Sequence, residues 1–395
     1  MSQAKALYQW EQRVATFFTD LPPARRAWLA LVSFGIALAQ CALLNRVVLR
    51  LAVALGISFN TLRQRLRKRY RPQATPDGQD RSFDYTACFG PLLRWASAGF
   101  TDRRLALAID PTTLGDRFTI LTVSVVFRSC AVPVAWQVQH GNATGSWNDR
   151  WQRLLGLLHQ TLGEGWQVLV LSERGLASKD LFEAITARGW HPLMRVQKGG
   201  HFLPEGWTRS WALGQFVTRQ KTRWRGRGLA GPGRSRLPCT LLACWEEGHA
   251  EPWLILTDLG PGDANAVWYA WRSWIEHGFR DLKSDGWQLS KTRMRDPERV
   301  GRWWTAAALA TLWALEAGTE AQRLEIPATQ TYAKAEGPAV TSLFALGLAV
   351  LAEQLGRGSR GRLRRLPQPA WPASDADSHR PSKQQRIAGH PRVPL

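Results

Sequence analysis

The pattern of apolar and polar positions begins with helices. Residues 1 to about 70 have helical periodicity, and the stretch Val47–Tyr70 predicts a helix, a turn at Gly56 and a second helix capped by Ser58 or Asn60. The cationic residues of that second helix are Arg63, Arg65, Arg67, Lys68 and Arg69. A short helix pair with a basic second helix is typical of a helix-turn-helix that contacts DNA. A plain helical hairpin with a solvated basic face fits the pattern equally well.

Strand-like runs dominate the middle of the chain, after a Pro- and Gly-containing linker at residues 71–82. Helical patterns at 147–163 and 178–188 alternate with the later strands. The predicted strands are Leu105–Asp110, Phe118–Phe127, Val132–Gln139, Trp166–Glu173 and His191–Val196. Three consecutive strands followed by alternating helices and strands predict an α/β fold with a mixed sheet.

Residues 197–257 break this alternation and predict a β-rich insertion. It contains a basic loop, Arg219–Arg236, that carries Trp224. Basic residues interleaved with an aromatic side chain favour contact with nucleic acid over a merely solvated loop. Further helices are predicted at 264–284, 297–317 and 339–355. A basic tail rich in Pro and Ser follows from Arg357 and is predicted to be disordered.

The amino-acid composition indicates what kind of partner the protein binds. The 395 residues carry a formal net charge of +21, which favours a polyanion, although a ribosomal or membrane surface would attract the same charge. Most of the 21 Trp should fill the core. The five Cys form no CxxC pair, so we expect a reduced, cytoplasmic setting and no zinc site at Cys239 and Cys244. The start does not resemble a signal peptide, and the apolar stretch Ala27–Leu44 predicts a buried helix, with no membrane role.

Four residues of the predicted helix 264–284 carry candidate chemistry. Tyr269, Arg272, Glu276 and Lys283 are separated by three, four and seven residues, so they lie within about 60° of one another on an α-helix. Arg280 falls on the same stripe. Chance could place an ordinary Arg–Glu pair on a solvated helix, so this spacing alone decides nothing.

Two further carboxylates strengthen the case. Asp110 and Glu173 each end an apolar strand, where they could meet Glu276 at one rim of the sheet. Three such carboxylates can hold two Mg²⁺ ions about 4 Å apart, which would activate a water or a 3′-hydroxyl. A strand-terminal acid is often only a loop cap, so neither residue would be convincing alone.

These residues resemble the signature of the DDE transposases of the insertion-sequence-4 type. Its intervals, Y-(2)-R-(3)-E-(6)-K, are matched by Tyr269, Arg272, Glu276 and Lys283. The sequence LAID around Asp110, ERGLASKDLF around Glu173 and DGWQLSKTRMRDPERV after Lys283 are similar too. The resemblance covers roughly residues 100–317.

The resemblance implies an RNase H-like catalytic core with a β-rich insertion. It implies that Asp110, Glu173 and Glu276 bind two Mg²⁺ or Mn²⁺ ions, and that transposon ends in double-stranded DNA are cleaved and joined to target DNA. It also implies that Tyr269, Arg272 and Lys283 contact phosphates of the terminal nucleotides and that an insertion-domain Trp, for which Trp224 is the candidate, holds a flipped base. We expect a homodimer on paired ends, associated with the nucleoid.

The predicted organisation has four parts. They are a helical DNA-binding region with its linker at 1–82, an RNase H-like catalytic domain at 83–317 with its insertion at 197–257, a helical region at 318–356, and the basic tail at 357–395.

One residue departs from the family pattern. The second carboxylate of the family is Asp, whereas this chain has Glu173. The extra methylene moves the carboxylate by about 1 Å, and misplacement of that order can lower a rate about 100-fold. Two alternatives to an active transposase therefore stay open. One is a catalytically impaired, transposase-derived DNA-binding protein, and the other is an RNase H-like nuclease without strand transfer.

Overall fold

The computed structural model of the protein describes residues 2–70, 83–233, 236–324 and 341–374. The predicted linker at 71–82 and the part of the predicted tail from residue 375 lie outside these residues. The chain divides into two compact units. The first unit comprises Met1–Arg104, Asp110–Trp166 and Ser273–Pro369, and the second comprises Leu105–Ile109, Gln167–Arg272 and Ala370–Leu395.

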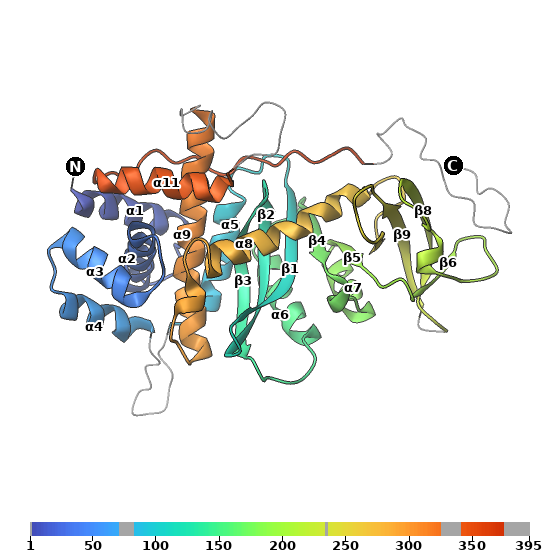
Figure 1. The fold of residues 1–395 in the computed structure, drawn as a ribbon, viewed down its shortest axis with the longest axis horizontal. Helices are drawn as coiled ribbons and strands as arrows, with labels where there is room; N and C mark the ends of the chain where they lie inside the picture. The colour runs from blue at the N-terminus through green and yellow to red at the C-terminus, as the bar shows by residue number, and fades with distance from the viewer. Residues whose placement is uncertain (1, 71–82, 234–235, 325–340, 375–395) are drawn as a thin grey trace. The chain divides into compact units, whose positions relative to one another are not determined.

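Four helices open the first unit. They are α1 (Gln3–Phe17), α2 (Pro23–Ala39), α3 (Leu44–Leu55) and α4 (Phe59–Tyr70) (Figure 1). Gly56 ends α3 with a φ of +64°, a left-handed conformation that glycine adopts without steric strain. The Ser58 hydroxyl caps α4 by accepting a hydrogen bond from the amide of Thr61 at 3.3 Å. The predicted helix, turn and helix are therefore confirmed, with Ser58 as the cap.

The apolar stretch Ala27–Leu44 lies largely in α2, which is buried as predicted. Among the described residues no single helix is long and apolar enough to cross a membrane. The bent pair of α2 and α3 reaches that length and composition only when both helices are counted together.

A long helix forms the centre of the first unit. α9 (Pro297–Arg323) is buried along most of its length, and its N-cap is Asp296, which accepts a hydrogen bond from the amide of Arg299. Trp313 of α9 stacks on Trp10 at a centroid distance of 4.0 Å. Eight Trp side chains are almost fully buried, as the sequence led us to expect: Trp10, Trp95, Trp136, Trp151, Trp287, Trp303, Trp304 and Trp313.

The strands form one hydrogen-bonded series in the order β3-β2-β1-β4-β5-β10-β9-β8-β6-β7. The first strands are β1 (Arg104–Leu114), β2 (Phe118–Phe127), β3 (Cys130–His140), β4 (Gln167–Ser172) and β5 (His191–Arg195). β2 and β3 are antiparallel, whereas β4 and β5 are parallel. The predicted α/β class, with a mixed sheet and helices towards both ends of the chain, is confirmed.

Helices of the first unit pack on β3. α8 (Trp274–Lys283) crosses β3 and β2, as Figure 1 shows. The other helices that contact β3 are α5 (Phe89–Ala96), α6 (Asn148–His159) and α9; a short 3₁₀ turn, η1 (Tyr85–Cys88), precedes α5. The core of this unit therefore lies between its sheet strands and these helices.

The second unit contains β4, β5 and the elements that follow them in the chain up to η4. Its further elements are η2 (Arg174–Leu176), α7 (Lys179–Thr186), β6 (His201–Pro204), β7 (Trp211–Ala212), η3 (Leu213–Gln215), β8 (Thr222–Ala230), β9 (Leu237–Trp245), β10 (Trp253–Thr257) and η4 (Ala266–Ser273). The strand-rich content predicted for 197–257 is confirmed. The prediction of a loop over Arg219–Arg236 is wrong in its centre, because β8 pairs with β9 from Thr222 to Ala230.

The C-terminal part of the described chain begins with α11 (Leu343–Gly356), which overlaps the helix predicted at 339–355. Residues 357–374 form neither helix nor strand, but they have defined contacts, which differs from the predicted disorder. In the first unit Leu366 is fully buried, and the carbonyl of Leu366 comes so close to Gly99 that a side chain there would collide with it. In the second unit Trp371 packs against Trp268 and Trp271.

Candidate active site

Glu276 lies in the first turn of α8, where the positive end of the helix dipole favours a carboxylate. The opposite side of α8 is apolar and packs on β3. Gly278 permits this close approach, since a Cβ atom at that position would lie 2.8 Å from the Cβ of Ala131. The packing leaves Glu276 and Arg280 exposed on the outer side of the helix.

Lys283 ends α8 and connects it to β1 within the first unit. Its Nζ donates a hydrogen bond to Oγ1 of the buried Thr112 at 2.7 Å. Burial lowers the pKa of Lys283, while the nearby negative charge of Asp110 opposes that shift. Asp110 sits two residues before Thr112 in β1, so β1 presents a carboxylate and a hydroxyl to the end of α8.

Asp281 was not among the predicted site residues. Burial raises the pKa of its carboxyl to about 7, and the neighbouring charge of Asp285 adds to this shift while Arg280 opposes it. The sequence signal was weak, because an acid between two cations on a helix normally looks solvated.

The second unit places Glu173 immediately after β4, as predicted. Its Oε2 atom is 3.2 Å from Nη1 of Arg272, and its Oε1 atom is 3.8 Å from Nε of Arg174. The Arg272 side chain is 11% exposed and that of Glu173 is 29% exposed, so water screens this pair only in part.

Tyr269 is buried one turn before Arg272. Its hydroxyl donates a hydrogen bond to the carbonyl of Ser172, the last residue of β4, at 3.3 Å. Its ring packs edge-on against Trp253 at 5.5 Å. Tyr269 and Arg272 therefore contact consecutive residues at the end of β4.

The helix predicted from 264 to 284 is wrong in its first half. Residues Ala266–Ser273 form the 3₁₀ helix η4, and the α-helix begins only at Trp274. Three residues per turn eclipse positions i and i+3, so Tyr269 and Arg272 point to the same side. Tertiary hydrogen bonds hold this turn, including one from Trp268 Nε1 to the carbonyl of Pro372 at 2.9 Å. The single α-helical face predicted for the four signature residues is thus replaced by two adjoining segments of different helical type.

A cationic cluster around Glu251 was missed by the sequence analysis. The Glu251 carboxylate lies 2.8 Å from Arg174, 3.3 Å from Lys198 and 3.6 Å from Arg195. Hydrogen bonds from Lys198 and Arg174 lower the pKa of Glu251. One carboxylate therefore faces three cations, and this corner of the second unit keeps a positive excess suited to an anionic ligand. No spacing rule could have found it, because β5, β10 and η2 bring distant residues together.

The predicted metal ligands are of the chemical type that the expected ion prefers. Carboxylate oxygens are the ligands that Mg²⁺ and Mn²⁺ prefer, and Asp110, Glu173 and Glu276 provide them. In the part of the chain that the structure describes, no three His, Cys, Asp or Glu side chains gather closely enough to hold a metal ion. Glu173 in addition has a guanidinium at its carboxylate, so a metal ion would compete with Arg272 for that oxygen.

The remaining predicted DNA contacts fall in different environments. Trp224 is part of β8 and is only 8% exposed, with Phe216 at 4.5 Å and Phe202 at 5.9 Å. Its ring is a core residue of the second unit rather than a free loop side chain, which is a correction to its predicted setting. Arg63 and Arg67 line a pocket of the first unit that is described below.

Comparison with known families gives a match over part of the chain. Residues 127–313, just under half of the chain, match the family model described as Transposase DDE domain. This match supports a DDE transposase. The matched segment includes Glu173 and Glu276 together with Tyr269, Arg272 and Lys283, and it begins after Asp110.

Other comparisons add little. A comparison with curated proteins found no match. A solved structure titled as a piggyBac transposase synaptic complex with hairpin DNA is similar over 64% of this chain and 53% of that chain, at 12% identity and a TM-score of 0.34. The matched region thus spans about half of that chain's length, and a TM-score this low assigns neither fold nor function.

Proposed function

We propose that this protein is a DNA transposase of the insertion-sequence-4 type that cleaves double-stranded DNA at transposon ends and joins those ends to target DNA. The observation that carries the proposal is the match of residues 127–313 to the transposase DDE domain, within which Tyr269, Arg272, Glu276 and Lys283 keep the intervals of the signature. The net charge of +21 supports a polyanionic substrate.

The proposed catalytic residues are Asp110, Glu173 and Glu276. Their carboxylates would hold Mg²⁺ or Mn²⁺, which supplies charge stabilisation at the attacking and leaving oxygens of phosphoryl transfer. Lys283 and Arg272 would bind phosphate oxygens, Lys as a point charge and Arg through its planar fork. Arg280, exposed on α8, adds a further cation for the DNA backbone. A homodimer on two paired ends is part of this proposal.

A second function is favoured by one specific observation. The ion pair between Arg272 and Glu173, together with Glu in place of the family's Asp, fits a DNA-binding protein whose catalysis is impaired. Such a protein would bind the DNA ends and leave them uncut. A nuclease without strand transfer would cut the ends and produce no joined target DNA.

Nicking of a duplex that carries the inverted repeats flanking the coding region tests the proposal. With Mg²⁺ we expect nicks at the repeat ends and joined products with target DNA. Asp110→Asn and Glu276→Gln should each lower the nicking rate by at least about 1,000-fold, because each removes a charged ligand of the metal.

Asp102→Asn is the matched control, because Asp102 is an exposed carboxylate of the first unit outside the proposed site. It should nick at the natural rate. Tight binding without nicking by the natural protein would support the impaired alternative, and nicks without joined products would support the nuclease.

A further inference from the structure

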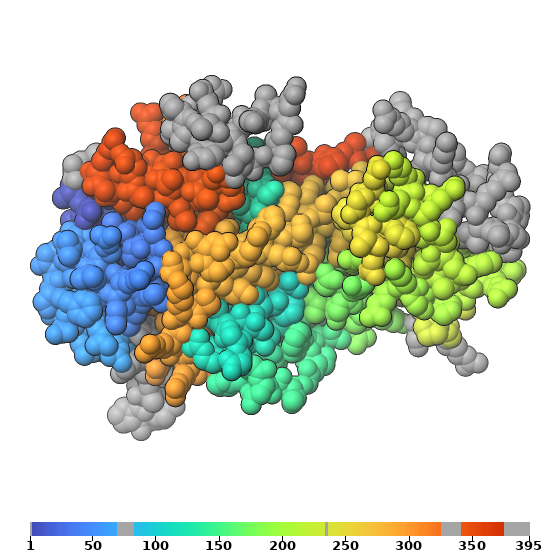
Figure 2. Space-filling view, viewed as in Figure 1, coloured from blue at the N-terminus to red at the C-terminus, as the bar shows by residue number. Residues whose placement is uncertain are grey.

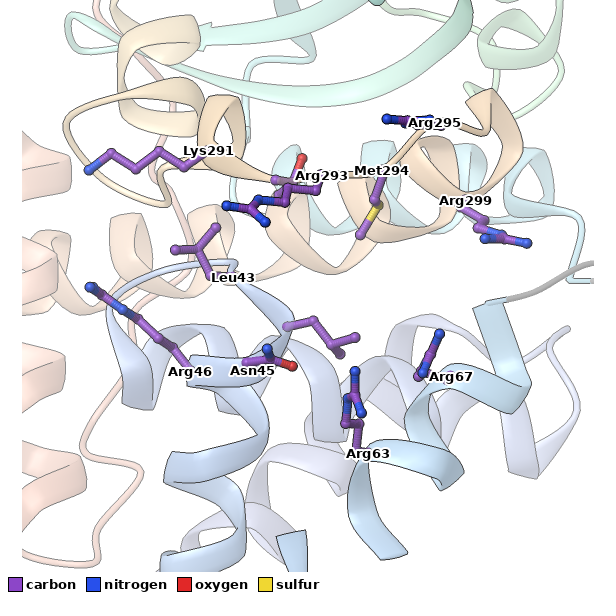
Figure 3. A pocket seen from close by; sticks show the side chains of 12 residues that line it. Leu43, Asn45, Arg46, Arg63, Arg67, Lys291, Arg293, Met294, Arg295 and Arg299 are labelled. Carbon is purple, nitrogen blue, oxygen red and sulfur yellow. The ribbon is translucent and has the colours of Figure 1, made fainter. Parts of the chain in front are cut away.

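A cationic pocket of about 550 Å³ lies in the first unit, outside the proposed catalytic residues. One wall comes from the N-terminal helices α3 and α4. Figure 3 shows Arg63 and Arg67 pointing from α4 towards the opposite wall, and Arg46 of α3 lies farther along the same wall, beyond Asn45. These arginines come from the region that the sequence predicted to contact DNA.

The opposite wall is the segment that joins α8 to α9. Its short 3₁₀ turn η5 (Leu289–Lys291) begins six residues after Lys283. This wall contributes Lys291, Arg293, Arg295 and Arg299. The pocket therefore combines seven cations from two segments that are more than 200 residues apart in the sequence. Figure 2 shows the blue surface of the N-terminal helices bordering the orange surface of this later segment.

Hydrogen bonds fix the two walls to each other. The amide of Ala42, at the start of the α2–α3 turn, donates to the carbonyl of Trp287 at 2.7 Å. The carbonyl of Ala42 accepts a hydrogen bond from Nε1 of Trp303 at 2.8 Å. Arg117 also donates to the carbonyl of Met294 at 2.6 Å. The segment 291–299 is thus held on both flanks, so the pocket is a built feature and not a chance gap.

Nearby carboxylates do not neutralise the pocket. Its lining contains no Asp or Glu. Asp296 is engaged as the N-cap of α9, and Glu298 lies 3.4 Å from Arg302. Among the described residues, no carboxylate forms an ion pair with any of the seven cations. Nε of Arg63 and Nε of Arg299 are buried without a hydrogen-bond partner, so each has a donor left for a bound anion.

We propose that this pocket binds the phosphate backbone of duplex DNA, with both walls acting as one site. The lining includes no Phe, Tyr or Trp, and single-stranded binding sites normally need such rings for bases to stack on. Backbone contacts fix the position of a duplex without reading its sequence. The inference rests on the proposed function for its substrate, and it extends that function by making the segment after α8 a DNA-binding wall.

The proposal differs from a helix-turn-helix reading of α4. Residues 63 and 67 are four apart and share one face of α4, whereas the exposed Arg65 points to the other side. If α4 simply presented its solvent face to DNA, Arg65 would contribute as much as Arg63 does. If the pocket is the site, Arg65 contributes little and Arg293, far away in the sequence, contributes strongly.

The test measures binding of a labelled duplex of arbitrary sequence by the full chain, in EDTA, over a series of NaCl concentrations. The variant Arg63→Ala/Arg67→Ala/Arg293→Ala should weaken binding by about tenfold or more and lower the salt slope of log K by about 3, one for each lost phosphate contact. The matched control Arg50→Ala/Arg65→Ala/Arg153→Ala removes the same charge from exposed positions and should keep the slope within about 1 of the natural value.

Two results would overturn the proposal: an unchanged salt slope in the pocket variant, or an equal loss in the control variant. The variant Arg63→Lys/Arg67→Lys/Arg293→Lys keeps the charge and should keep most of the slope, which separates lost contacts from misfolding. Since EDTA prevents nicking, this result is independent of catalysis, and a failure of the proposed nicking would leave it unaffected.

Discussion

The two halves of the segment Ala266–Lys283 use the same kinds of residue in different ways. The 3₁₀ half, η4, directs its polar side chains to the end of β4, where Tyr269 bonds to Ser172 and Arg272 pairs with Glu173. The α-helical half, α8, directs Lys283 to Thr112 of β1 and leaves Glu276 exposed. The polar side chains of η4 thus contact the end of β4. Those of α8 differ among themselves, since Lys283 contacts β1 and Glu276 is exposed.

The contrast is clearest between Glu173, which contacts η4, and the acids of α8. Glu173 beside η4 lies 3.2 Å from Arg272 and 3.8 Å from Arg174. In α8 burial favours the neutral form of Asp281, while Glu276 five residues earlier is exposed. The setting of each acid therefore depends on what packs around it, and not on its place in the motif.

The largest effect is expected from Asp281→Asn, which tests the half-buried acid of α8. The pKa of Asp281 is about 7 in the folded protein, against 3.8 for an ordinary Asp. A raised carboxyl pKa contributes stability that is fully present below about pH 4 and is lost as the pH rises through about 7. The Asn variant should exceed the natural protein in urea unfolding by only about 1 kcal/mol at pH 4.5 and by up to about 4 kcal/mol at pH 8.

Asp102→Asn, an exposed change, should show no such dependence on pH. A difference between Asp281→Asn and the natural protein that is the same at pH 4.5 and pH 8 would contradict the raised pKa. It would remove the contrast drawn between η4 and α8.

Much of the fold was predictable because apolar periodicity reports local structure directly. The strand run before Glu173 was located from alternation and β-branched content, and the Gly56 turn from a glycine at a helix end. The strand that was expected to end at Asp110 instead continues to Leu114, so Asp110 lies within β1. η4 was not predictable, since Trp268 and Tyr269 hold it through bonds to Pro372 and Ser172, which no local pattern encodes.

The candidate site was predictable only as a set of residue types at fixed intervals. The intervals identified Glu276 and its companions, but their contacts depended on a change of helix type at Trp274. The loop prediction around Trp224 failed because arginines and glycines normally indicate a loop, and here the pairing of β8 with β9 outweighs that preference.

A smaller effect is expected from Glu173→Asp, which tests the partner of η4. The shorter side chain withdraws the carboxylate by about 1 Å, which lengthens its 3.2 Å contact with Arg272 and restores the length found in the family. We expect metal-dependent nicking to rise by up to about 100-fold, equivalent to about 2.7 kcal/mol in the barrier. Equal rates for Glu173→Asp and the natural protein would show that the site has adjusted to glutamate.

The smallest effect is expected from Tyr269→Phe, which removes one hydroxyl from η4. The ring stays packed against Trp253, but the bond to the carbonyl of Ser172 at 3.3 Å is lost. A neutral hydrogen bond of this kind contributes about 1 kcal/mol, so urea unfolding should show a loss of that order. Tyr8→Phe, at a position that is 61% exposed, should change stability by less than about 0.5 kcal/mol. If the two variants are equally stable, the hydroxyl does not hold η4 to β4, and the Trp268–Pro372 hydrogen bond and the Arg272–Glu173 pair must hold this turn.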